Sequence, residues 1–186
     1  LEPLAHLLGR VATVLDAAGV RYAVVGGVAV NLVGEIRETK DLDCTLALEE
    51  AGIPGVAEAF EKAGFVVGHY GGPGAPMARW MRLTQPSADP PIRTDLIVAT
   101  DGLWKNVVAR ARPLPIGDGV YPVATPEDLI LLKLKAGRLQ DLFDAASVMK
   151  VQGLRRTPVD LAYLDGEAGR WGVGEPWRKL REAMKE

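Results

Sequence analysis

Apolar residues recur along this chain with the two spacings of regular secondary structure. In residues 3–18 they return every three or four positions, which predicts a helix. The short apolar run Arg21–Val25 predicts a strand, and Gly26 and Gly27 end it. Val28–Val33 then predicts a short helix, so the glycine pair lies in a strand-to-helix turn.

The stretch Asp41–Leu48 alternates between apolar and mostly polar residues. Alternation with a period of two is typical of a strand with one buried face. Leu42 and Cys44 would lie on the apolar face of this strand. Asp41 and Asp43 would lie together on the opposite face.

Later segments are read in the same way. Glycine and proline clusters separate them, so a loop is expected at Gly71–Pro76 and a turn at Gln85–Pro91. Helices are expected at Pro54–Ala63 and Trp104–Ala109, and strands at Phe65–His69, Met77–Leu83 and Ile92–Val98. Arg112–Ile116 and Val120–Val123 are expected to be short edge strands, because both carry or adjoin prolines.

The pattern becomes helical after Val123. Thr125 is suited to cap a helix that begins at Pro126, and Gly137 is suited to end it. Further helices are expected at Leu139–Val151, Val159–Ala168 and Glu175–Lys185. The order of elements predicts an α+β fold with a small mixed β-sheet flanked by helices. We expect an α/β core over 1–124 and a helical region over 125–186 packed on it.

Composition narrows the class of protein. Apolar residues make up 48% and charged residues 25% of the 186 residues, a balance typical of a globular protein with a sizeable core. The net charge of −2 argues against a protein that coats nucleic acid non-specifically, although a local basic groove remains compatible with it. No apolar run is long enough for a membrane helix, so we expect no membrane partner.

The cysteine count and the start of the chain bear on its compartment. Cys44 is the single cysteine, which excludes an intrachain disulfide and fits a reducing, cytoplasmic location. Its place on the apolar face predicts a core residue and not a nucleophile. The opening LEPLAHLLGR is not typical of a signal peptide. Because it starts with Leu1, we expect a trimmed N-terminus.

Three features together suggest phosphoryl chemistry. The glycine pair lets the backbone approach an anion at a helix N-terminus. Asp41 and Asp43 share a strand face with Cα atoms about 6.5–7 Å apart, so they can jointly hold Mg²⁺ or Mn²⁺. Asp95 lies inside an apolar strand, where an acid is costly unless a metal or a cation faces it. It is the candidate third carboxylate, as a metal ligand or as a base.

Each of these features also has a structural explanation. Strand-to-helix turns often need glycine, and two aspartates on the polar face of a strand can simply face water. Asp95 could pair with Arg79, Arg82 or Arg93. The conjunction of all three features along one chain favours a catalytic site.

The stretch Val24–Leu46, VVGGVAVNLVGEIRETKDLDCTL, resembles the nucleotidyltransferase superfamily that includes DNA polymerase beta and the aminoglycoside nucleotidyltransferases. The glycine pair followed by Arg37, Thr39, Asp41 and Asp43 at every second position is most similar to the abortive-infection toxin branch. The segment Thr125–Met149 is similar to the helical signature of that branch. Its polar positions are matched by Lys133, Arg138, Asp141 and Asp144. The resemblance covers most of residues 20–150.

This resemblance implies a role for each residue that matches the motif. Gly26 and Gly27 would lie against the nucleotide phosphates. Thr39 would help to shape the phosphate loop. Asp41 and Asp43 would bind the metal ions.

Further roles are implied for residues outside that stretch. Asp95 would be the third metal ligand or the base. Lys133 would reach the triphosphate, although an ordinary surface lysine explains it equally well. Asp141 and Asp144 lie three residues apart on one helix face, where they could hold Arg138 or Lys133 in place.

The implied activity is transfer of a nucleoside monophosphate from an NTP such as ATP to a hydroxyl or phosphate acceptor, with release of pyrophosphate. The acceptor would be a tRNA, a protein or a small molecule, and an antitoxin or another helical protein would be the partner in a toxin–antitoxin setting. Gly27 replaces the serine of many active members, and the chain is short for one with a large acceptor-binding domain. A nucleotide-binding or interaction module without turnover is therefore the alternative.

Tryptophans are the remaining conspicuous residues. Trp171 and Trp177 are expected to pack in the interior. The role of Trp80 has two explanations, because Arg79 and Arg82 flank it. The three residues could line an acceptor groove, or they could form a solvated strand face.

Overall fold

A computed structural model of the chain describes residues 2–70, 80–85, 92–99 and 102–184. Contacts divide the chain into two compact units. Unit 1 comprises Leu1–Val28 and Glu38–Ala124, and unit 2 comprises Ala29–Arg37 and Thr125–Glu186. Residues 29–37 thus group by their contacts with the C-terminal helices.

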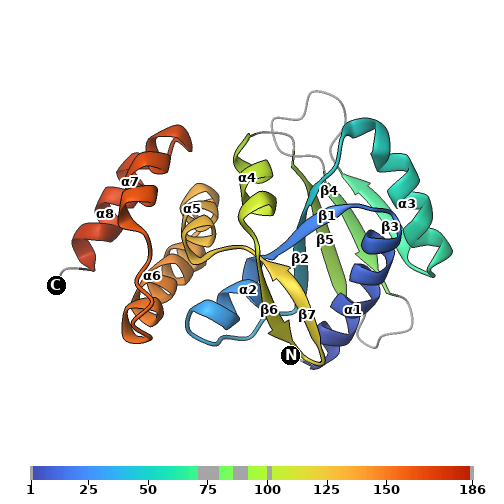
Figure 1. Cartoon of the computed structure of the whole chain (residues 1–186), viewed down its shortest axis with the longest axis horizontal. Coiled ribbons are helices and arrows are strands. Elements are labelled where there is room, and N and C mark those ends of the chain that lie inside the picture. Colours follow the sequence, from blue (N-terminus) through green and yellow to red (C-terminus); the bar gives the residue numbers. More distant parts are fainter. Residues whose placement is uncertain (1, 71–79, 86–91, 100–101, 185–186) are drawn as a thin grey trace. The chain divides into compact units, whose positions relative to one another are not determined.

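Unit 1 is built on a seven-stranded mixed sheet (Figure 1). Its strands are β1 (Arg21–Val25), β2 (Asp41–Ala47), β3 (Val66–Tyr70), β4 (Trp80–Thr84), β5 (Arg93–Val98), β6 (Arg112–Ile116) and β7 (Gly119–Val123). They lie in the order β3-β4-β5-β2-β1-β7-β6. The β2–β5 and β1–β7 pairs are parallel, and the other pairs are antiparallel.

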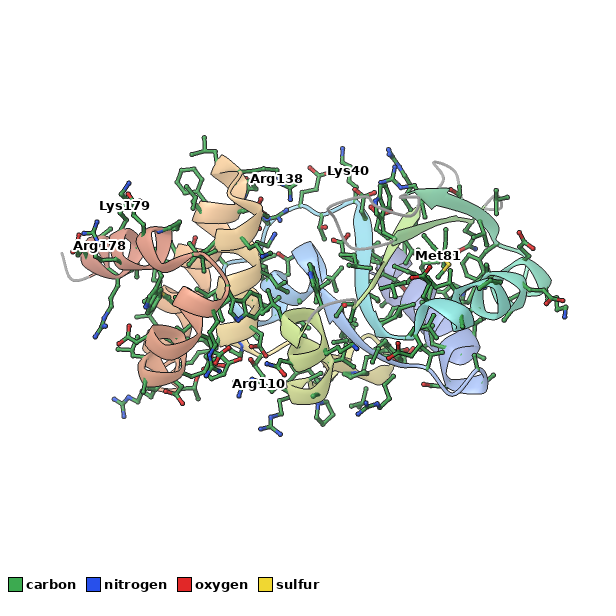
Figure 2. The ribbon with its side chains drawn as sticks, turned by 90° about the horizontal axis from the view of Figure 1, so that it is seen from above. Lys40, Met81, Arg110, Arg138, Arg178 and Lys179 are labelled. Carbon is green, nitrogen blue, oxygen red and sulfur yellow. The ribbon has the colours of Figure 1, made fainter. Side chains whose placement is uncertain are left out.

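One face of this sheet forms the core of unit 1. The helices of unit 1 are α1 (Glu2–Ala17), α3 (Ile53–Lys62), α4 (Gly102–Arg110) and the first turn of α2 (Gly26–Val33), with a short 3-10 helix at Glu50–Gly52. α1 and α3 lie side by side (Figure 1). α1 covers the face that carries Leu42, Cys44 and Leu46, which are fully buried. Met81 of β4, labelled in Figure 2, is also buried.

Unit 2 is a helical cluster. After the end of α2 it contains α5 (Pro126–Ala136), α6 (Leu139–Leu154), α7 (Leu161–Arg170) and α8 (Gly174–Ala183). α5 contacts the other three of these helices. Thr125 caps it by accepting a hydrogen bond from the Asp128 N–H at 3.3 Å, and Gly137 ends it with φ +68°. Trp171 and Trp177 are buried, as the sequence predicted.

The structure confirms the α+β class and most predicted elements within a few residues. One position in the sheet was wrong: β7 lies between β1 and β6 and is not an edge strand. Pro122 does not prevent this, because the pairing with β1 begins after it, at Val123 opposite Val24. The loop Gly71–Pro76, most of the turn Gln85–Pro91 and the start of Met77–Leu83 lie outside the described residues. No helix in the described parts of the chain has both the length and the apolar character that a bilayer crossing requires.

Candidate active site

A row of paired residues crosses the polar face of the sheet in unit 1. Asp43 of β2 lies opposite Asp95 of the parallel strand β5 and opposite Val25 of β1. Asp95 in turn lies opposite Arg82 of β4. Residues paired across neighbouring strands point to the same face, so Arg82, Asp95 and Asp43 stand side by side there. The register therefore brings two of the three predicted acids together.

Asp41 belongs to the neighbouring row at the end of the same strand face. It lies opposite Arg93 of β5. The Arg93 Nε atom is 3.9 Å from Asp41 Oδ1, and both side chains are more than half exposed. An exposed pair at this distance is weak, so it leaves the Asp41 carboxylate accessible to a ligand.

Gly26 lies directly against the Asp43 side chain. It follows Val25, the residue opposite Asp43, and adopts φ +66°. A Cβ atom at this position would come within 2.6 Å of Asp43 Cγ and 2.8 Å of Asp43 Cβ. Only glycine has both the backbone freedom and the small size required here. The turn backbone and the Asp43 carboxylate therefore border the same space.

The other two residues expected near phosphates, Gly27 and Thr39, both precede these acids in sequence. Gly27 is buried in the first turn of α2, where backbone N–H groups lack helical partners and favour an anion. Thr39 lies just before β2, and its hydroxyl donates to the Asp41 carbonyl oxygen at 3.4 Å. That contact shapes the segment through which the chain enters β2.

Asp95 is held by an arginine. Arg82 Nε donates to Asp95 Oδ1 and Arg82 Nη2 to Asp95 Oδ2, each at 2.8 Å. The guanidinium carbon of Arg82 lies 4.9 Å from the ring centroid of Trp80, a cation–π contact. Of the three arginines considered from the sequence, Arg82 is thus a partner of Asp95, Arg93 lies beside Asp41, and Arg79 lies outside the described residues.

The donor set suits a hard divalent cation in part. Asp41 and Asp43 offer carboxylate oxygens on one strand face, which are ligands that Mg²⁺ and Mn²⁺ prefer. Among the residues that the structure describes, no group of three histidine, cysteine or acidic side chains is arranged to hold a metal. Both oxygens of Asp95 accept from Arg82. Asp41 and Asp43 are therefore the side chains on this face that could hold a metal.

Cys44 lies behind the acids, on the apolar face of β2. Its side chain is completely buried, as predicted. Burial, and secondarily the charge of Asp43, raises the pKa of its thiol. Cys44 is accordingly a core residue, and the chemistry of this strand belongs to its carboxylates.

The other predicted polar positions gather in unit 2. Lys133 of α5 is buried, so it is not an ordinary surface lysine. Its Nζ atom lies 3.0 Å from Asp141 Oδ1 and 2.8 Å from Asp144 Oδ2. Arg138, labelled in Figure 2, donates to Asp141 at 2.6 Å. Asp141 and Asp144 therefore hold Lys133 and Arg138 in place, as expected from the sequence.

Arg37 completes this cluster. Its Nε and Nη2 atoms donate to the two oxygens of Asp144 at 2.7 and 2.8 Å. Burial raises the pKa of Asp144, but hydrogen bonds from Arg37, Lys133 and Gln140 outweigh it and hold this pKa at about 2. Asp144 thus remains a carboxylate at any physiological pH.

Asn31 is a residue that the sequence reasoning missed. Its side chain donates to the Arg37 carbonyl at 2.8 Å and accepts from the Arg37 N–H at 3.0 Å. It is buried in α2, and the available signal was one amide side chain in the apolar run GGVAVNLV. Through Asn31 and Asp144, unit 2 fixes both the backbone and the side chain of Arg37, four residues before Asp41.

Comparison with known proteins places this arrangement among solved folds. No protein-family model and no curated protein matches the chain. The antibiotic-resistance factor ANT(2'')-Ia matches in two structures: a solution structure, and a crystal structure in complex with adenylyl-2''-tobramycin. The solution structure gives 12% identity and a TM-score of 0.58 and covers 96% of this chain and 98% of its own. The crystal structure gives 14% identity and a TM-score of 0.56, and it covers 83% of this chain and 92% of its own.

Two further structures agree. An antigenic nucleotidyltransferase-like protein from Paracoccidioides brasiliensis shares 17% identity and a TM-score of 0.55, over 92% of this chain and 91% of its own. The lincosamide adenylyltransferase LnuA, bound to lincomycin, shares 15% identity with this chain and has a TM-score of 0.53. The match covers 77% of this chain and 95% of its own. The protein described here has the nucleotidyltransferase fold.

Proposed function

We propose that the chain is a metal-dependent nucleotidyltransferase that moves a nucleoside monophosphate from an NTP to a hydroxyl or phosphate acceptor. The observation that best supports this is that Asp43 and Asp95 are paired on one face of the sheet, with Gly26 against Asp43 and Asp41 in the neighbouring row. A turn that can approach phosphate and carboxylates that can hold a divalent cation are the elements that this reaction needs.

The reaction forms one bond and breaks one. An acceptor oxygen attacks the α-phosphorus of the NTP, the bond from that phosphorus to the bridging oxygen breaks, and pyrophosphate leaves. The proton of an acceptor hydroxyl passes to Asp95. Asp41 and Asp43 would hold Mg²⁺ or Mn²⁺, which supplies charge neutralisation at the triphosphate when it is bound.

The remaining site residues orient the nucleotide. Gly26 and the N–H groups that follow it in α2 contact the phosphates, and Thr39 shapes the entry to β2. Lys133 is proposed as a further contact of the triphosphate. Since two carboxylates already surround Lys133, it would exchange part of that contact for phosphate oxygens.

Among acceptors, the fold likeness favours a small hydroxyl compound. One matched structure of ANT(2'')-Ia contains adenylyl-2''-tobramycin, and the matched structure of LnuA contains lincomycin. This chain covers 92% and 95% of the length of those structures, and ATP is the first donor to test. The Arg37-to-Asp43 motif instead favours a tRNA or a protein as the acceptor. In that case the chain would have an antitoxin-type helical partner in the cytoplasm.

The test is an acceptor screen. The purified chain is incubated with each NTP labelled at the α-phosphate, Mg²⁺ or Mn²⁺, and in turn small hydroxyl compounds, total tRNA or cell lysate. Label in one acceptor fraction, matched by an equal release of pyrophosphate, is the expected result. Absence of release with every donor and acceptor would refute the transferase.

A binding module of the same fold is the second candidate. Gly27 stands where many active relatives carry serine, and Asp95 is already paired with Arg82. Such a module would bind NTP and metal as tightly as an enzyme and release no pyrophosphate. Measuring NTP affinity beside pyrophosphate release separates the two.

A further inference from the structure

The pairing of Arg82 with Asp95 is specified by the sheet. The two residues are direct cross-strand partners on β4 and β5. Two parallel hydrogen bonds of 2.8 Å join the guanidinium to both carboxylate oxygens. This fork geometry fixes the plane of the carboxylate as well as its position. Only 30% of the Arg82 side chain and 22% of the Asp95 side chain are exposed, so water screens the pair incompletely.

Trp80 restricts the arginine from the same strand face. Its ring lies 4.9 Å from the guanidinium carbon of Arg82, two residues along β4. A guanidinium that both stacks on an indole and forms two hydrogen bonds keeps few alternative rotamers. Asp95 therefore faces a fixed cation.

The consequence differs for the two roles considered for Asp95. Each oxygen already accepts one bond from Arg82, and a neighbouring cation opposes the approach of a second one. The remaining lone pairs can still accept a proton from a hydroxyl, because that acceptor is neutral before transfer. The geometry suits a base and disfavours a metal ligand.

We infer that Arg82 is a positioning residue that orients Asp95 toward the acceptor and keeps it out of the metal-ligand set, so that Asp41 and Asp43 are the protein ligands of the metal. The inference rests on the proposed function and assigns the acceptor side of that site to the Arg82–Asp95 pair.

Arg93 supplies a matched control. It is also an arginine beside a site carboxylate on this face, but it lies 3.9 Å from Asp41 and its side chain is 58% exposed. Arg93→Ala removes the same charge as Arg82→Ala without releasing a forked carboxylate. Any effect of general charge on metal affinity will appear in both variants.

The test is Mn²⁺ binding without nucleotide, measured by the EPR signal of free Mn²⁺. Asp43→Asn should lower the affinity by at least about tenfold, because it removes a ligand. Arg82→Ala should raise the affinity or add a second bound ion, because it frees Asp95, and Arg93→Ala should do neither. The double variant Arg82→Ala, Asp95→Asn has the wild-type net charge, and it should bind Mn²⁺ like the wild type.

The double variant decides the question. If Asp95 is a metal ligand, the double variant will lose affinity as Asp43→Asn does, and that result would overturn the inference. Equal gains in Arg82→Ala and Arg93→Ala would also overturn it, because the effect would then be general charge. Thermal unfolding of each variant confirms that the protein is folded during the measurement.

Kinetics provide the second readout where transfer is observed. Arg82→Ala should lower kcat and leave KM for the NTP unchanged, because the residue acts on the acceptor side, and Arg82→Lys should recover part of kcat. An unchanged kcat in Arg82→Ala would count against the positioning role. Mn²⁺ binding needs no turnover, so the two proposals can fail separately. Wild-type Mn²⁺ affinity in the double variant, together with no pyrophosphate release by the wild-type protein, would refute the transferase and leave the ligand assignment standing.

Discussion

At the scale of single residues, the backbone conformation of Gly26 brings the glycine turn against the Asp43 side chain, on the face of the sheet that carries Asp41, Asp43 and Asp95. Its φ of +66° is one that side chains beyond glycine rarely adopt, and the Asp43 side chain occupies the place of a Cβ atom. Two separate restrictions therefore act on one position. They can be separated experimentally, because other glycines share the first restriction without the second.

Gly26→Ala should lower stability and abolish transfer. The backbone strain costs about 1 kcal/mol, and the methyl group must displace the Asp43 carboxylate. Gly19→Ala is the control, since Gly19 has φ +65° and nothing within 4 Å of its Cβ position. Chemical denaturation and pyrophosphate release should show similar strain in both variants but loss of activity in Gly26→Ala alone. Comparable activity in the two would mean that Gly26 does not border the reacting groups.

The sequence predicts the glycine turn, but it does not predict that Asp43 packs against this turn. Gly26 ends an apolar run, which is a local signal. Its contact with Asp43 depends on the antiparallel register that places Val25 opposite Asp43. Likewise three arginines were possible partners for Asp95, and only the strand register selects Arg82.

At the scale of secondary-structure elements, local patterns predicted helices and strands well. Alternation marked β2, and Thr125 and Gly137 marked both ends of α5. The order of strands depends on long-range pairing, and β5 joins β2 in parallel although β3 and β4 intervene in the sequence. The interior place of β7 was missed for the same reason, because proline content reports local hydrogen bonding and not the neighbours of a strand.

The cluster between α5 and α6 yields a prediction for acid stability. The folded-state pKa of Asp144 is about 2, below its ordinary value of 3.8, so its charged form stabilises the folded state. This contribution, about 2 kcal/mol, is complete above pH 3.8 and disappears as the pH falls toward 2. The pKa of Asp141 is also lowered, since hydrogen bonds from Arg138 and Lys133 outweigh burial, which raises it.

Asp144→Asn should therefore lower the free energy of unfolding at pH 7 and flatten its decline below pH 4. Tryptophan fluorescence during denaturation reports on unit 2 through the buried Trp171 and Trp177. Glu175→Gln is the control, because its pair with Lys179 is exposed and such pairs contribute little. Identical pH profiles for Asp144→Asn and the wild type would contradict the assigned charge state.

At the scale of the whole molecule, the chain shares its fold with proteins of very different sequence. Structures that share only 12–17% identity with the chain have TM-scores of 0.53–0.58 with it. Such likeness identifies an architecture, and one architecture serves many acceptors. The proposed activity therefore rests on the face of unit 1 that carries Asp41, Asp43 and Asp95, where the strand register brings the glycine turn next to the carboxylates.

The most direct test of that argument is pyrophosphate release from labelled NTP by Asp41→Asn and Asp43→Asn, compared with the wild type at saturating Mn²⁺. Each variant should keep its fold and lose at least about a hundredfold in rate, while the exposed Asp118→Asn should remain fully active. Wild-type release by both Asp41→Asn and Asp43→Asn would contradict the proposed site.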